Sequence, residues 1–61
     1  STDVYELGND LIHSELLSKD EYLDQKYIIK IWELNRAGNT NYAYLLWSVL
    51  IYLNWKNIWI K

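Results

Sequence analysis

The stretch YAYLLWSVLIYL, residues 42–53, decides the fold class of this chain. Every residue in it except Ser48 is apolar or aromatic. A β-strand is the competing interpretation, but strands rarely exceed about ten residues. A helix that is apolar on all sides is buried in protein or in a membrane. We therefore predict a buried helix over residues 41–58.

A membrane span over residues 42–60 is the alternative for this segment. A spanning helix needs about 20 mostly apolar residues, and Ser48, Asn54, Lys56 and Asn57 interrupt the run. Residues 42–53 alone have the length of a buried core helix. We expect no membrane span and, because the N-terminus is acidic without an early apolar run, no signal peptide. The expected location is the cytoplasm.

The N-terminal part of the chain predicts another helix, over residues 3–17. Its apolar side chains recur at spacings of 3, 4 and 7, which is typical of one helix face. Thr2 is the expected N-cap. Ser18 and Glu21 then match a capping box, which predicts a short turn at this point.

The middle of the chain predicts a helix over residues 24–36. Asp24 is its expected N-cap and Gly38 its expected end. The polar residues 39–41 form a connector and supply N-caps for the last helix. So short a connector favours antiparallel neighbours.

The predicted fold is therefore all-α, with three helices over about 3–17, 24–36 and 41–58. The last two helices form an antiparallel hairpin, and residues 1–61 form a single helical unit. The main buried side chains are expected on the second and third helices: Ile31, Trp32, Leu46, Trp47, Leu50 and Trp55.

The chain carries more apolar surface than 61 residues can hide. Hydrophobic residues make up 51% of it, with four Trp and six Tyr. A domain of this size buries only about 60% of its unfolded surface, and without Cys it has no disulfide to stabilise it. We expect the chain to be part of a larger protein or an oligomer.

The charges are few and segregated. Six Lys and Arg against eight Asp and Glu give a net charge of −2, which argues against a nucleic-acid-binding module. Residues 1–24 hold seven acidic side chains and one basic, whereas residues 25–61 hold one acidic and five basic. We favour solvated helix faces for these charges. Attraction between the two halves is the alternative, and it would orient their packing.

Three groups of residues could carry chemistry. Glu6, Asp10 and His13 share a helix face and could bind a metal, but a solvated polar face explains them better. Asp20, Glu21 and Asp24 could do acid–base work, but they lie at predicted helix starts, where carboxylates are ordinary caps.

The aromatic residues of the last helix form the third group. Proteins that stack bases on aromatic side chains alternate them with Lys and Arg, and none lies between Tyr42 and Trp55. The aromatics are therefore expected in a core or an interface. The chain also lacks a Gly-rich phosphate loop and a Cys nucleophile. We assign no catalytic, cofactor-binding or metal-binding residue to it.

Four landmarks follow one another within residues 13–59: Tyr22-Leu23-Asp24, Gly38 with Asn41, Leu46-Trp47 and Trp55. In this order and spacing they resemble the C-terminal segment of the asparagine synthetase (glutamine-hydrolysing) family. In that family a Tyr/Phe-Leu-Asp element precedes a helix, a Gly-Asn-type linker follows, and a Leu-Trp pair opens a last helix that ends near another Trp. Members often carry Glu-His before the linker, where this chain has Leu34-Asn35.

The resemblance implies a parent with two further domains. One is a glutaminase with a Cys nucleophile. The other binds ATP through a Ser-Gly-Gly-x-Asp-Ser loop, adenylates a carboxylate with magnesium and receives ammonia. None of those residues lies in this chain. The segment itself would be structural, without a cofactor, and its partner would be the rest of the synthetase domain. The alternative is a stand-alone helical module for self-association or protein interaction, with neither nucleic acid nor membrane as partner.

Overall fold

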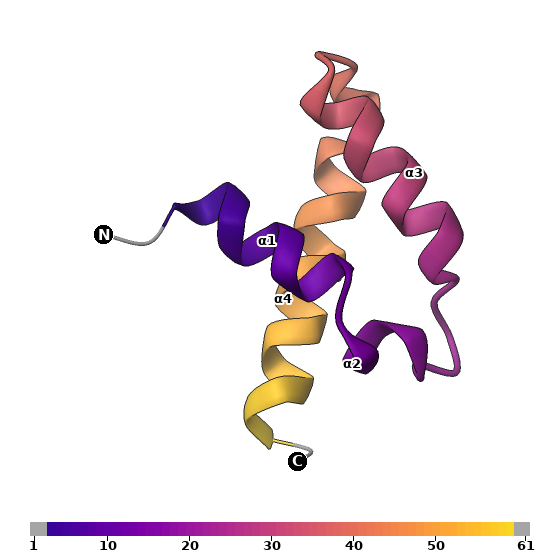
Figure 1. Ribbon diagram of the computed structural model, residues 1–61, viewed down its shortest axis with the longest axis vertical. Coiled ribbons are helices and arrows are strands. Elements are labelled where there is room, and N and C mark those ends of the chain that lie inside the picture. Colours follow the sequence, from indigo (N-terminus) through magenta and orange to yellow (C-terminus); the bar gives the residue numbers. More distant parts are fainter. Residues whose placement is uncertain (1–2, 60–61) are drawn as a thin grey trace.

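The computed structural model describes residues 3–59, and all regular structure in this range is helical. The all-α prediction is confirmed. Three longer helices dominate, and within residues 3–59 no helix has both the length and the apolarity to cross a membrane. The elements in chain order are α1 (Val4–Ile12), α2 (Glu15–Ser18), α3 (Gln25–Arg36), the 3-10 turn η1 (Thr40–Tyr42) and α4 (Ala43–Trp59), shown in Figure 1.

The first helix is shorter than the sequence predicted. It ends at Ile12, and residues 15–18 form the separate turn α2. Ser14 causes the break, because its hydroxyl donates to the Leu11 carbonyl at 2.7 Å and accepts from the Leu17 amide at 3.3 Å. A Ser side chain that binds nearby backbone competes with helix continuation and caps the next helix instead.

The predicted caps around α1 and α2 need correction. Thr2 lies outside the described residues, and Asp3 caps α1 by accepting from the Tyr5 amide at 3.0 Å. Ser18 does not open a capping box: it is the last residue of α2, and its hydroxyl donates to the Glu15 carbonyl. The Ser-x-x-Glu pattern here falls at the end of a turn instead of the start of a helix.

The ends of α3 follow the sequence prediction. Asp24 is the N-cap and accepts from the Lys26 amide at 3.0 Å. At the other end Gly38 has a φ of 106°, a conformation that favours glycine. The Gly38 amide donates to the Asn35 carbonyl and the Asn39 amide to the Leu34 carbonyl. This pair of bonds is a Schellman motif, which satisfies carbonyls that the helix end leaves free.

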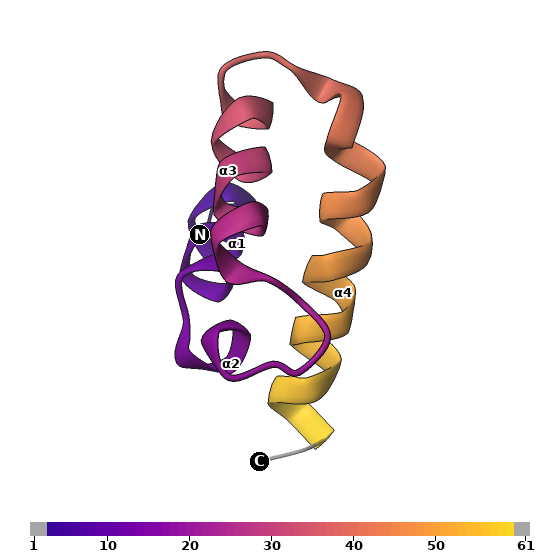
Figure 2. The ribbon, with the colours of Figure 1, turned by 90° about the vertical axis from the view of Figure 1, so that its right-hand side faces the viewer.

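The helices surround one small core. Figure 2 shows α1, α2 and α3 on one side of the molecule and α4 on the other, and in Figure 1 α1 crosses α4. The Gln25 side chain donates to the carbonyls of Ile12 and Ser14, which closes the end of α1 onto the start of α3. Every α-helix contributes to the core, whose buried apolar residues are Ile12, Leu17, Ile28, Ile31, Trp32, Leu46, Val49 and Leu53.

Half of the predicted core residues on α3 and α4 are buried. Ile31, Trp32 and Leu46 lie in the core, and Leu50 is half-buried against it. Trp47 and Trp55 were wrongly expected there, since each is at least half exposed. Because α4 is apolar all round, its residue pattern did not reveal which face would turn inward.

Candidate functional site

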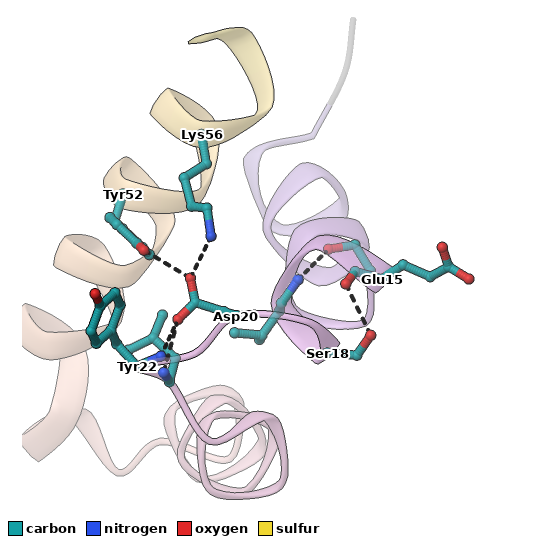
Figure 3. Close-up of polar contacts among 9 residues, drawn as sticks. Glu15, Ser18, Asp20, Tyr22, Tyr52 and Lys56 are labelled. Carbon is teal, nitrogen blue, oxygen red and sulfur yellow. Dashed lines mark hydrogen bonds and ion pairs between the residues drawn. The ribbon is translucent and has the colours of Figure 1, made fainter. Parts of the chain in front are cut away.

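The most connected polar group in the described chain is the carboxylate of Asp20, in the loop between α2 and α3. Its Oδ1 accepts from the amides of Tyr22 and Leu23, at 2.8 and 2.9 Å. Its Oδ2 accepts from the Tyr52 hydroxyl and from Lys56 Nζ, both at 2.8 Å (Figure 3). We call these five residues the Asp20 clip. The clip fastens the loop to the C-terminal half of α4.

The clip is buried and ionised. The Asp20 side chain is fully buried, and Lys56 keeps about a fifth of its side chain exposed. Burial raises the pKa of the Asp20 carboxyl, but hydrogen bonds from Lys56, Tyr52 and the two loop amides together outweigh it and hold this pKa well below its usual range. The hydrogen bond to Asp20 in turn raises the pKa of Tyr52 and of Lys56.

These shifts define what the clip can do. A general acid or base works best when its pKa lies near the operating pH. In the clip the carboxylate stays charged and the phenol and ammonium stay protonated at neutral pH, because each shift leads away from neutrality. The arrangement therefore holds two segments together and is unsuited to proton transfer.

The predicted acidic cluster is only partly a set of caps. Asp24 caps α3 as expected, and Glu21 is exposed. Asp20 does more than cap, because it reaches α4 across 36 residues. The sequence held one signal for this contact: Lys56 is the single charged residue between Tyr42 and Trp59. A lone cation in an apolar helix needs a buried partner or a route to water.

The candidate metal residues on α1 do not form a cluster. Among residues 3–59 no group of three His, Cys, Asp or Glu side chains is placed to hold a metal ion. His13 lies just beyond the end of α1, and its Nδ1 is 2.9 Å from the Asn9 carbonyl oxygen. Glu6 and Asp10 are exposed, which fits the solvated polar face that the sequence favoured.

The aromatic residues divide between core and surface. Trp32 is buried, and its Nε1 donates to Asn9 Oδ1 at 3.2 Å. By contrast, a line of large apolar side chains along the outer side of α4 is at least half exposed. We call this line the α4 stripe: Trp47, Ile51, Trp55 and Ile58. Its spacings of four, four and three residues place its members on one helix face.

A shallow groove runs beside the stripe between α1 and α4. From α1 it is lined by Val4, Leu7 and Leu11, and from α4 by Trp47 and Ile51, among others. Val4 and Leu7 are also more than half exposed. The stripe and the groove together form a continuous apolar surface over two helices, and exposed apolar patches of this kind mark interaction sites.

Comparison of the chain with models of known families, with curated proteins and with solved structures finds no match in any of the three.

Proposed function

We propose that this chain is a helical packing segment whose α4 stripe is covered by another protein surface. The observation that carries the proposal is the exposure of Trp47, Ile51, Trp55 and Ile58 in a single line. Burying a large apolar side chain completely contributes about 1.5–3 kcal/mol. Covering the four half-exposed side chains of the stripe therefore contributes several kcal/mol toward the cost of association, which is about 4–15 kcal/mol.

The first candidate for that surface is the synthetase domain of an asparagine synthetase-like amidotransferase. The support is the resemblance of residues 13–59 to the C-terminal segment of that family, and the comparisons with known proteins add none. In this role the chain is a structural segment of an ATP-dependent ligase in the cytoplasm. ATP and magnesium belong to the parent domain. We propose further that α3 and α4 act as an antiparallel hairpin, which the six-residue connection 37–42 supports.

The second candidate is another copy of the same chain. The separation of charge favours it, because Glu6 and Asp10 on α1 and Lys26 and Lys30 on α3 are exposed and form no ion pair within residues 3–59. Two copies related by a twofold axis can place the acidic α1 of each near the basic α3 of the other. The apolar surface over α1 and α4 would then lie between them.

Light scattering after size exclusion tests the second candidate. The chain should be larger than its 7.4 kDa monomer at micromolar concentration, and Ile51→Lys should return it to a monomer because the charge falls on the stripe. Tyr22→Lys is the matched control, since Tyr22 is exposed in the loop between α2 and α3. It lies outside the apolar surface over α1 and α4 and outside helices α1 and α3, and its substitution should leave the association unchanged. A monomeric wild-type chain with a sharp thermal transition excludes self-association.

The in-frame genomic sequence upstream of this segment tests the first candidate. A reading frame that encodes a Ser-Gly-Gly-x-Asp-Ser loop supports the amidotransferase parent. A stop codon, or a long frame without that loop, contradicts it. If that loop is absent upstream and the chain is monomeric in solution, neither proposed surface covers the stripe. The proposal that the chain is a packing segment is then wrong.

A further inference from the structure

A second apolar feature lies on the other side of Trp47, where α1, α3 and α4 meet. It is a pocket of about 140 Å³. Tyr5, Trp32 and Trp47 supply aromatic walls, and Ala43 and Asn35 complete the lining, among others. The groove between α1 and α4 shares Val4, Trp47 and Leu50 with it but extends in the direction of Ile51 and Asn54. The pocket is therefore a separate hollow beside the α4 stripe.

The size of the pocket matches a single six-membered ring. An apolar protein cavity of about 150 Å³ accommodates benzene, so a pocket of about 140 Å³ takes up one ring of that size. Aromatic walls favour an aromatic guest, because rings attract one another in offset or edge-to-face arrangements. Tyr5 and Trp32 already lie this way, with centroids 6.1 Å apart and planes tilted by 53°.

Asn35 gives the pocket a polar requirement. Its Oδ1 is buried and accepts no hydrogen bond in the described structure. Buried polar atoms without a partner are uncommon in proteins because such burial is unfavourable. Rotation about the last side-chain bond of Asn is soft. Rotation of the Asn35 carboxamide about this bond can therefore bring Oδ1 into the pocket. Because Oδ1 accepts no hydrogen bond, this rotation breaks none to Oδ1.

We propose that this pocket binds one aromatic ring that carries a hydrogen-bond donor, of the phenol class, with the hydroxyl donating to Asn35 Oδ1. Trp32 and Trp47 hold the ring, and Asn35 selects for the donor. The ring comes either from a free small phenol or from a Tyr side chain of a partner. The pocket shares Trp47 with the α4 stripe, and Val4, Trp47 and Leu50 with the groove. A partner on that surface can therefore cover the pocket, and binding is tested in the dissociated chain as well as in the wild type.

Titration with p-cresol, followed by the indole N–H signals in a proton–nitrogen NMR spectrum, tests this site. The four Trp residues give four such signals. Those of Trp32 and Trp47 should shift, whereas those of Trp55 and Trp59, which do not line the pocket, should stay. Toluene, which lacks the hydroxyl, is the matched ligand. One neutral hydrogen bond predicts a preference for p-cresol of roughly threefold to tenfold, with a Kd of about 1 mM.

Four variants sharpen the titration. Asn35→Leu keeps the branched shape and should abolish the preference for p-cresol over toluene, while Asn54→Leu makes the same change outside the pocket and should retain it. Ala43→Leu fills the pocket and should abolish binding of both ligands. The titration is also repeated in Ile51→Lys. If self-association covers the pocket in the wild type, the pocket is open in this monomeric variant.

Several outcomes overturn the proposal: no binding in either background, equal binding of p-cresol and toluene, a preference that persists in Asn35→Leu, or shifts centred on Trp55 and Trp59. N-acetyltyrosinamide identifies the source of the ring. If it binds at least as tightly as p-cresol, the pocket accepts a Tyr side chain with its backbone. If only p-cresol binds, the site takes a free phenol.

Discussion

The two faces of α4 carry similar residues in different surroundings. The inner face places Leu46, Val49 and Leu53 in the core, and the outer face places Trp47 and Ile51 at the surface. A helix apolar on both sides does not specify its own orientation. Other parts of the chain distinguish the two faces: the helices that pack on the inner face of α4, and the Asp20 clip beside that face.

The polar contacts of α4 therefore determine which of its faces turns inward, which the apolar pattern does not specify. Tyr52 and Lys56 lie one turn apart on α4, and both bind the same carboxylate oxygen of Asp20. This fixes the rotation of α4 about its axis, since turning the stripe inward would carry Lys56 away from its only ion-pair partner within residues 3–59. Four groups on one carboxylate thereby make one face of α4 the inner face.

The comparison between faces is tested most severely by truncating one residue on each. Leu53→Ala should destabilise the chain by about 2–5 kcal/mol, because Leu53 is fully buried and its truncation leaves a cavity. Ile51→Ala removes a similar volume from the outer face and should change the free energy of unfolding by less than about 0.5 kcal/mol in the dissociated chain. Urea denaturation followed by circular dichroism measures both. Equal losses would mean that the two faces are equally buried in solution.

Removing the charge of the clip should have the next largest effect. Asp20→Asn keeps the shape of the side chain but leaves Lys56 without its counter-ion, at a cost of about 2 kcal/mol. The partial exposure of Lys56 keeps the cost below that of a fully buried pair. Glu15→Gln is the control, because the Glu15–Lys19 pair is exposed and should contribute no more than a few tenths of a kcal/mol. A harmless Asp20→Asn change would show that the core alone orients α4.

The clip also predicts how stability depends on pH. The folded chain holds the pKa of Asp20 below its ordinary value of 3.8, so the unfolded chain binds the proton more readily. The contribution of the clip is complete above about pH 4 and is lost as the pH falls through the folded pKa. The difference in unfolding free energy between wild type and Asp20→Asn should therefore shrink in acid. A difference that stays constant from about pH 6 to about pH 2 contradicts this assignment.

At alkaline pH the stability contributed by the clip changes with pH in the opposite direction. Hydrogen bonding to Asp20 raises the pKa of Tyr52 above 10.0 and that of Lys56 above 10.5. Their contribution is complete below these values and is lost as the pH rises through the folded pKa values. Asp20→Asn should remove this shift, which ultraviolet titration of the tyrosines can follow.

The smallest effect is expected where α1 meets the side of the core. A Cβ added at Gly8 would lie 2.6 Å from Trp32 Cη2. Gly8→Ala therefore forces α1 and Trp32 apart, at a cost of about 1–3 kcal/mol, against which the better helix propensity of Ala returns about 1 kcal/mol. A net loss of about 1 kcal/mol is expected in urea denaturation, with a shifted Trp32 indole signal. A gain in stability would show that α1 has room to move.

The sequence predicts those parts of this fold that are local. Asp24, Gly38 and the polar connector after it mark the ends of α3 correctly, because caps depend on residues within one turn. The break at Ser14 was missed, since the same residue could equally continue a helix. The outward positions of Trp47 and Trp55 could not be read from an all-round apolar pattern. The contact of Asp20 with Tyr52 and Lys56 joins residues more than 30 positions apart, and no local spacing rule covers such a pair.

The long span of the Asp20 clip has a consequence for how the chain folds. The turns at Ser14 and Gly38 involve neighbouring residues and can form within a microsecond or so. The clip closes a circuit of 36 positions, and the chain loses the entropy of that closure before Asp20 and Lys56 attract each other at short range. We therefore expect the C-terminal half of α4 to dock last. Until Tyr52 and Lys56 dock, the Asp20 carboxylate and the loop that carries it stay open to water.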